Sequence, residues 1–147
     1  MDRTPRTGRI SRLAPIALAV LGALFIGAIG LAYLFAPSAI APGFGFAVVP
    51  AAEGYFQVKG IRDPASGLAI IALLATGHRR ALGVLMIVMA TIPAGDALNV
   101  ALHGGDLMTA IFVHALTAAL VIATGILLLR QRRAQREFQL SSARPSL

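Results

Sequence analysis

The sequence predicts an all-α integral membrane protein, a four-transmembrane-helix bundle with both termini in the cytoplasm. Of the 147 residues, 57% are hydrophobic and 13% are charged, about half the charged fraction of a soluble domain. The apolar residues form long unbroken runs, as is typical of helices that cross a bilayer. These runs fill one transmembrane domain (13–129), which lies between a basic N-terminus (1–12) and a basic tail (130–147).

The first predicted span is the run from Leu13 to Phe35. At 1.5 Å per residue it is long enough to cross about 30 Å of hydrocarbon. Basic residues precede this run, and the stretch from Ser38 to Ala41 resembles a signal-peptidase site. The apolar core is longer than that of a signal peptide, so we expect the span to be retained.

The second predicted span must begin near Pro50 or Ala51, because the apolar stretch from Pro64 to Gly77 is too short to cross by itself. Pro64 then lies inside the helix and should bend it. In the alternative, a helix begins at Pro64 and Asp63 is only its N-cap.

The third span is expected from Ala81 to about Ala101, and the fourth from about Leu107 to Leu129. Pro93 lies in the third run and is followed closely by Gly95, so this helix should be distorted there. The abundance of glycine and alanine in all the runs indicates close helix packing.

The arginines indicate the orientation of the bundle. Clusters of arginine beside apolar runs are typical of cytoplasmic ends, and this places both termini and the turn 78–80 inside. The segment 37–50 and the turn 103–106 would face the other side, with Glu53 and Asp106 against the single lysine, Lys59. The clusters contain the following residues: Arg3, Arg6, Arg9, Arg12, Arg79, Arg80, Arg130, Arg132, Arg133, Arg136 and Arg144.

Several classes of function are excluded or disfavoured by composition. The positive charge stands at span ends with one aromatic residue, Phe138, beside it, so nucleic acid is not an expected partner. The chain has no cysteine and three histidines, which excludes disulfide and thiol chemistry and disfavours a structural zinc site. We expect no metal and no cofactor.

Three ionisable residues are predicted to lie at one depth. Asp63, Asp96 and His114 each stand about 14–15 residues, or about 21–23 Å, from the cytoplasmic end of their span. An ionisable group at that depth costs about 2.5–3.5 kcal/mol, so it should face the bundle interior and have a partner. Arg62 is the nearest counter-ion for Asp63. We predict these four as catalytic residues around a polar pocket that opens to the non-cytoplasmic side.

Further polar and small residues near this level are predicted to bind a substrate. Small residues on the face of Asp63, namely Gly60 and Gly67, would leave room for a ligand. The predicted set comprises Tyr33, Ser66, Gly67, Asn99, His103 and Thr117.

Each predicted site residue also has a structural alternative. Arg62 would reach lipid headgroups, Asp96 would hydrogen-bond to a neighbouring helix, and His114 would be a satisfied core histidine. Tyr33 and Tyr55 would anchor their spans at the membrane interface. These alternatives stay open at the level of the sequence.

The predicted set suits acid–base chemistry. One carboxyl group would donate a proton to a substrate oxygen while the other activates water or abstracts a proton. An Asp–Arg–Asp set beside an apolar cavity is similar, in chemistry alone, to the site of limonene epoxide hydrolases, which are soluble and differ in fold. The sequence therefore favours a hydrolase or isomerase that acts on a lipophilic small molecule.

Three motifs resemble a known family over about residues 15–130. They are GIRD (Gly60–Asp63), IPAGD (Ile92–Asp96) and the His-x-x-Thr pattern of His114–Thr117. Together they are similar to the small four-span membrane proteins of the domain-of-unknown-function family four-two-six-seven (DUF4267), which look related in architecture to DoxX-like proteins. The resemblance implies an enzyme for a lipophilic substrate, since some relatives are linked to biosynthesis with epoxide opening.

Two other functions remain as alternatives. A DoxX-like subunit, quinone-linked or needed for assembly, would use the bundle as a packing surface and have no catalysis of its own. A small multidrug-type transporter is disfavoured, because the first span carries no acidic residue. We expect a multi-pass protein of a bacterial inner membrane, with the lipid bilayer and a lipophilic small molecule as partners. The glycine-rich first span offers a surface for a homodimer.

Overall fold

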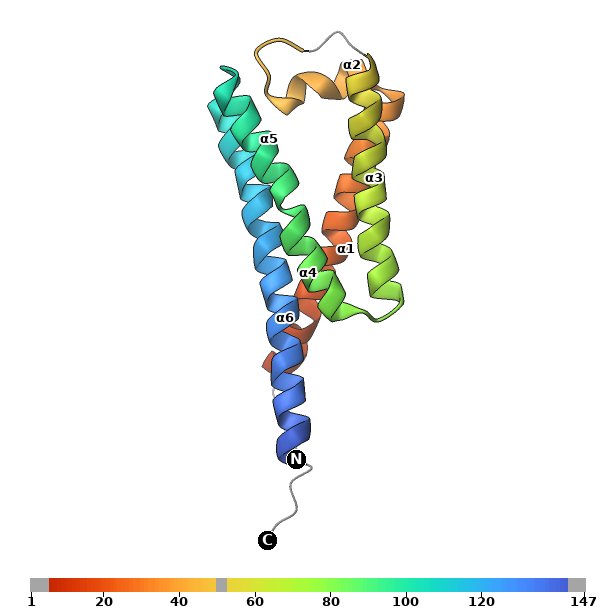
Figure 1. Ribbon diagram of the computed structural model, residues 1–147, viewed down its shortest axis with the longest axis vertical. Helices are drawn as coiled ribbons and strands as arrows, with labels where there is room; N and C mark the ends of the chain where they lie inside the picture. Colours follow the sequence, from red (N-terminus) through yellow and green to blue (C-terminus); the bar gives the residue numbers. More distant parts are fainter. Residues whose placement is uncertain (1–5, 50–52, 143–147) are drawn as a thin grey trace.

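The computed structural model describes residues 6–49 and 53–142, and every regular element in these two stretches is helical, as predicted (Figure 1). Short elements join the long helices: α2 (Pro37–Ile40), a 3-10 turn η1 (Ala41–Phe44) and a π-helical segment η2 (Thr109–Ala115). The longer helices are α1 (Arg6–Phe35), α3 (Glu53–Ala75), α4 (Arg79–Met89), α5 (Thr91–Leu102) and α6 (Leu116–Ser142).

Three helical stretches are long and apolar enough to cross a membrane: Leu13–Phe35, Arg79–Leu102 and Thr109–Gln131. They fit a multi-pass membrane protein. Helix α3 is long enough but does not meet the same criterion of composition, because Lys59, Arg62 and Asp63 follow Glu53 in its first half.

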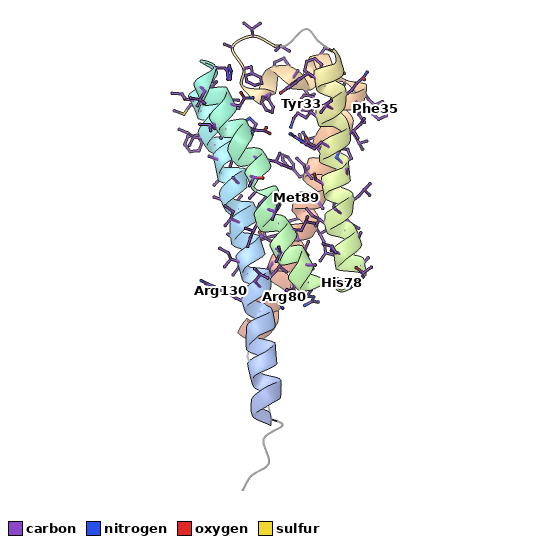
Figure 2. The ribbon with its side chains drawn as sticks, viewed as in Figure 1. Tyr33, Phe35, His78, Arg80, Met89 and Arg130 are labelled. Carbon is purple, nitrogen blue, oxygen red and sulfur yellow. The ribbon has the colours of Figure 1, made fainter. Side chains whose placement is uncertain are left out.

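The helices form two pairs. Helix α1 packs along α3, whereas α4 packs against α6 and α5 against η2. Figure 1 shows the pairs closest at one end and diverging toward the other, where α2 and η1 cross between them. His78, Arg80 and Arg130 lie near the first of these ends, here called the basic end, and Tyr33 lies near the second (Figure 2).

Two apolar clusters hold the pairs together. Near the basic end, the cluster joins α1, α3, α4 and α6 through Ala19, Ala23, Ile70, Leu82, Met86 and Leu128. At the opposite end, the short elements supply the centre of the cluster, which contains Tyr33, Ala41, Phe44, Phe56, Val100 and Ala110. Between Phe56 and Ile70, α3 therefore runs from one cluster to the other, and the charged residues lie on this stretch.

Glycines set the distance between paired helices. A Cβ atom on Gly67 would lie 2.6 Å from the Ala23 carbonyl oxygen, and one on Gly60 would lie 2.7 Å from the Leu34 side chain. On α1, Gly30 faces Pro64 and Asp63 so closely that a Cβ would overlap the proline ring. Small residues permit this approach where no hydrophobic force drives helices together. The space beside Gly60 and Gly67, which we predicted to be free for a ligand, is thus filled by α1.

Helix α3 continues through Pro64, as the sequence predicted. The alternative in which Asp63 only caps a new helix is wrong, because Asp63 stands in the middle of the element. The predicted start of this span at Pro50 or Ala51 lies outside the described residues.

The third predicted span is divided into α4 and α5 at Ala90. Pro93 has no N–H to donate to the Met89 carbonyl, so the regular ladder lacks one hydrogen bond there. The Thr91 hydroxyl donates to the Val88 carbonyl oxygen at 2.7 Å. The predicted distortion is confirmed, and it lies about one turn before the proline.

The fourth predicted span contains a π-helical segment that the sequence did not indicate, and it continues past Leu129. Residues 130–142, part of the predicted basic tail, extend α6 without a break. In the N-terminal region, α1 begins at Arg6, ahead of the predicted start at Leu13. Residues 1–5 and 143–147 lie outside the described part of the chain.

We expect Gly30→Ala to lower the free energy of unfolding by about 1–3 kcal/mol, the usual cost of overpacking. The new methyl group would force α1 away from Pro64 and Asp63. Gly27→Ala is the matched control, because a Cβ there meets no atom within 4 Å. Thermal unfolding in detergent measures both variants, and equal midpoints would contradict the role of Gly30.

Candidate functional site

Four charged side chains meet where α3 faces α5. Lys59 Nζ lies 2.9 Å from Asp63 Oδ2, and Arg62 Nε lies 3.0 Å from Asp63 Oδ1. Asp96 Oδ2 lies 3.8 Å from Lys59 Nζ and 3.7 Å from Arg62 Nη2. We call Lys59, Arg62, Asp63 and Asp96 the ion-pair cluster. The structure thus brings together three of the four predicted catalytic residues, Arg62, Asp63 and Asp96.

The cluster is neutral when all four groups are ionised, because two cations face two carboxylates. Its members differ in burial: the exposed fraction of the side chain is 1% for Asp63, 9% for Lys59, 19% for Asp96 and 38% for Arg62. Buried charges persist only when they are paired and hydrogen-bonded. Asp63 and Lys59 therefore form the inner half of the cluster, and Arg62 and Asp96 form the accessible half.

The two carboxylates are held differently. Both oxygens of Asp63 accept hydrogen bonds, from Lys59 and from Arg62. Within the described residues, Asp96 accepts no hydrogen bond and has only the two longer ion-pair contacts. Distances of 3.7–3.8 Å exceed a direct hydrogen bond, so Asp96 keeps more of its acceptor capacity than Asp63 does.

Aromatic rings cover Lys59 on the side away from Asp63. Its ammonium nitrogen lies 5.1 Å from the centroid of the Tyr33 ring and 5.0 Å from that of Phe44. Tyr33 in turn stacks on Phe56, with 6.1 Å between their centroids. Such cation–π contacts stabilise an ammonium group that has left water. Tyr33 is buried, so its ring packs inside the bundle.

His114 is not in contact with the carboxylates. Its Nε2–H donates to the Phe44 carbonyl oxygen at 2.9 Å, and its ring lies 4.7 Å from the Phe44 ring. Phe44 therefore stands between His114 and Lys59. His114 was predicted to share one site with the aspartates. It lies beside Phe44, which contacts Lys59, but it does not contact the carboxylates, and its Nε2–H is already bonded to the Phe44 backbone.

The predicted substrate-binding residues are dispersed. Ser66 lies one turn from the cluster and donates to the Arg62 carbonyl oxygen at 2.9 Å. Thr117 donates to the Val113 carbonyl oxygen of its own helix. Asn99 and His103 are both exposed, and His103 Nδ1 donates to the Asn99 carbonyl oxygen. Within the described residues, none of these four side chains has a hydrogen bond or ion pair to the charged groups of the cluster.

Two members of the site were missed at the level of the sequence. Lys59 was counted only as an outer charge, although its i,i+4 spacing from Asp63 is a signal for an intrahelical ion pair. Phe44 carries no polar atom in its side chain, and its approach to Lys59 depends on how 37–44 folds back. Only the aromatic pair in GFGF (Gly43–Phe46) hinted at a packed segment.

Asp106 lies outside the cluster, at the tip that joins α5 to η2. Its Oδ2 accepts hydrogen bonds from the Thr109 hydroxyl at 2.6 Å and from the Thr109 N–H at 2.8 Å. These bonds hold the pKa of the Asp106 carboxyl below its usual range. Asp106 is therefore an N-cap. In the part of the chain with described side chains, no group of three or more His, Asp or Glu residues could hold a metal ion.

We expect Asp63→Asn to lower the free energy of unfolding by about 3–5 kcal/mol, because it leaves two cations facing one carboxylate. The double variant Lys59→Met/Asp63→Leu removes one charge of each sign and keeps the Arg62–Asp96 pair. It should recover most of that loss. Thermal unfolding in detergent compares the two. A double variant as unstable as the single one would show that charge balance is not the cause.

Comparison with known proteins gives one match. Searches of curated proteins and of solved structures find none for this chain. The family profile described as "Domain of unknown function (DUF4267)" matches residues 23–128, a stretch that begins in α1, ends in α6 and includes every member of the ion-pair cluster. The chain belongs to the DUF4267 family.

Proposed function

We propose that the protein is a membrane-embedded acid–base enzyme that opens an epoxide on a lipophilic small molecule. The observation that carries the proposal is the unequal binding of the two carboxylates. Asp63 is buried and accepts a hydrogen bond on each oxygen, whereas Asp96 is partly exposed and lies 3.7–3.8 Å from two cations. A water molecule or a substrate oxygen could form hydrogen bonds to Asp96 and to one of these cations at the same time.

In this proposal Asp96 is the general base. Its carboxylate accepts a proton from water, and the water oxygen attacks one epoxide carbon as the ring C–O bond breaks. The proton taken up by Asp96 returns to the alkoxide, so water adds across the ring and no other reactant is needed. General bases contribute about 10²–10⁴-fold to a rate.

Arg62 supplies electrostatic stabilisation. Its guanidinium is the most exposed group of the cluster and carries several N–H donors that can face the epoxide oxygen. Negative charge grows on that oxygen in the transition state, and fixed cations are most effective where charge develops. Lys59 adds positive potential from behind Asp96.

Asp63 is a positioning residue in this scheme. It holds Lys59 Nζ at 2.9 Å and Arg62 Nε at 3.0 Å, and both its oxygens are occupied. The sequence had left open which aspartate acts as base. The hydrogen bonds favour Asp96, and they assign Asp63 to holding the two cations.

The alternative function is a DoxX-like subunit in which the neutral cluster only fixes helix packing. For the inner half of the cluster, two observations favour this alternative: the cluster has no net charge, and Asp63 forms short hydrogen bonds to both cations. They do not explain the accessible carboxylate of Asp96, and this is the point on which the two functions are separated.

We expect Asp96→Asn to lower turnover at least about 100-fold, because an amide cannot take a proton from water. The substrate is trans-stilbene oxide, and diol formation by purified protein in lipid nanodiscs is measured. Asp106→Asn is the matched control, since Asn is an equally good N-cap and the residue lies outside the cluster. Its rate should equal that of the wild type.

Two results would contradict the proposal. Turnover by Asp96→Asn at the wild-type rate would remove the base and favour the assembly-subunit alternative. A wild-type protein that forms no diol from trans-stilbene oxide or limonene oxide would count against the epoxide class as a whole. Thermal unfolding of each variant shows whether a loss of rate reflects a loss of fold.

We also propose that α3 is a fourth span, with both termini in the cytoplasm of a bacterial cell and the domain in its inner membrane. Helix α3 has 23 residues and lies along α1, itself a candidate span. The charges of Lys59, Arg62 and Asp63 are paired, which removes much of the cost of placing them in lipid. Arginines at the basic end support the orientation.

Single cysteines test this topology, because the chain has none of its own. We expect Gly54→Cys to react with a membrane-impermeant maleimide in intact bacterial cells, and Thr76→Cys to react only after lysis. Both positions are exposed and stand at opposite ends of α3. Reaction of both from the same side would show that α3 does not cross.

A further inference from the structure

We infer that His114 is a positioning residue that holds Phe44 over Lys59, so that the segment from Pro37 to Gly45 covers the ion-pair cluster. The part of this inference that concerns access of a substrate to the cluster rests on the proposed function. The cover is also a property of the fold, and it can be tested without any substrate.

The Phe44 ring lies between two groups that do not touch each other. Its centroid is 5.0 Å from Lys59 Nζ on one side and 4.7 Å from the His114 ring on the other. It also lies 5.0 Å from the Phe46 ring. Phe44 is 5% exposed although it belongs to a short connecting segment. The side chain therefore fills the space that leads from this end of the bundle to Lys59.

Two consecutive backbone carbonyls fasten the segment to the far helix pair. The Phe44 oxygen accepts from His114 Nε2–H at 2.9 Å, and the Gly45 oxygen accepts from the Asp106 N–H at 2.8 Å. Gly45 has φ +100°, a conformation that favours glycine, and a Cβ there would lie 2.8 Å from Thr109. The segment begins directly after α1, so it connects the two helix pairs across the end where they diverge (Figure 1).

The π-helical segment explains how His114 reaches this carbonyl. Segment η2 contains one residue more per turn than an α-helix would, which rotates the side chains before Leu116 relative to those of α6. His114 and Ala110 are the buried residues of η2, and both face the cluster that contains Phe44. Such π-helical turns are frequent at functional sites.

The cover also restricts which molecules reach the cluster at Lys59. The groups next to Lys59 are the rings of Phe44 and Tyr33, and Phe56 stacks on Tyr33. An apolar substrate would lie against these rings, whereas a polar one would lose its hydration there. Phe44 is thus expected to favour apolar substrates.

Lys59 is the single lysine of the chain, so its acetylation reports on the cover. N-hydroxysuccinimidyl acetate is added to the full-length protein in detergent, and acetyl-Lys59 is followed by peptide mass spectrometry, separately from the N-terminal amine. We expect His114→Ala to be acetylated about tenfold faster than the wild type, the factor that one lost hydrogen bond contributes to opening. Phe44→Ala, which keeps the backbone carbonyl, should react at least as fast.

Two further variants make the test specific. His114→Gln retains an N–H donor at similar reach and should restore the slow rate. Phe25→Ala removes an exposed ring from α1 and should react as the wild type does. Helical content by circular dichroism shows that each variant is folded, and if His114→Ala does not fold, Phe44→Ala and His114→Gln still decide the question.

Acetylation at the wild-type rate in Phe44→Ala would overturn the cover, and fast acetylation in His114→Gln would overturn the role of the hydrogen bond. Diol formation from trans-stilbene oxide is measured on the same preparations. If the wild type forms no diol but its Lys59 is acetylated slowly and that of Phe44→Ala rapidly, the proposed function alone is contradicted. Normal turnover with unchanged acetylation in Phe44→Ala would contradict the cover alone.

Discussion

The structure depends on the pairing of Asp63 with two cations of its own helix. A carboxylate with 1% of its side chain exposed would be strongly destabilising among apolar helices if it were unpaired. Lys59 and Arg62 satisfy both of its oxygens, and α3 can therefore lie along α1 over its length. Gly30 of α1 stands opposite Asp63 and Pro64, so the tightest contact of this pair and its most polar residues coincide. The packing and the charges at this point must be explained together.

The two ends of the bundle are held by different means. Near the basic end, apolar side chains of α1, α3, α4 and α6 pack together. Glycines bring α4 and α6 close there, since a Cβ on Gly125 would lie 2.8 Å from the Gly83 carbonyl oxygen. At the other end the helix pairs diverge, and the connection is made by Phe44, by two hydrogen bonds to the η1 end and by the ion pairs of Asp96. At the end where the candidate site lies, polar contacts thus add to the apolar packing of the second cluster.

The sequence predicts those features that depend on one helix at a time. Long apolar runs indicate the helices, Pro93 marks the break between α4 and α5, and counting residues from the arginine clusters places Asp63 and Asp96 at one level. Features that depend on chain reversal are not predicted. Whether Phe44 reaches Lys59 is decided by how Pro37–Gly45 folds back. The direction of His114 is decided by a π-helical segment, for which apolar sequence gives no periodic signal. Lys59 could have been identified, because a lysine four residues before a buried aspartate is a local pattern.

Each of the four charges in the ion-pair cluster has a part in its charge balance. Asp63 with one cation would form a neutral pair and leave nothing for a reaction. A second cation gives the inner group a net positive charge, and Asp96, contributed by the other helix pair, restores neutrality from 3.7–3.8 Å. Attraction between the two halves of the bundle therefore acts through the one carboxylate that is not hydrogen-bonded. When a proton or a substrate oxygen binds at Asp96, it changes the charge that joins α3 to α5. The same contact that would perform the chemistry is then also one that holds the diverging end together, and this couples the occupancy of the site to the spacing of the helices around it.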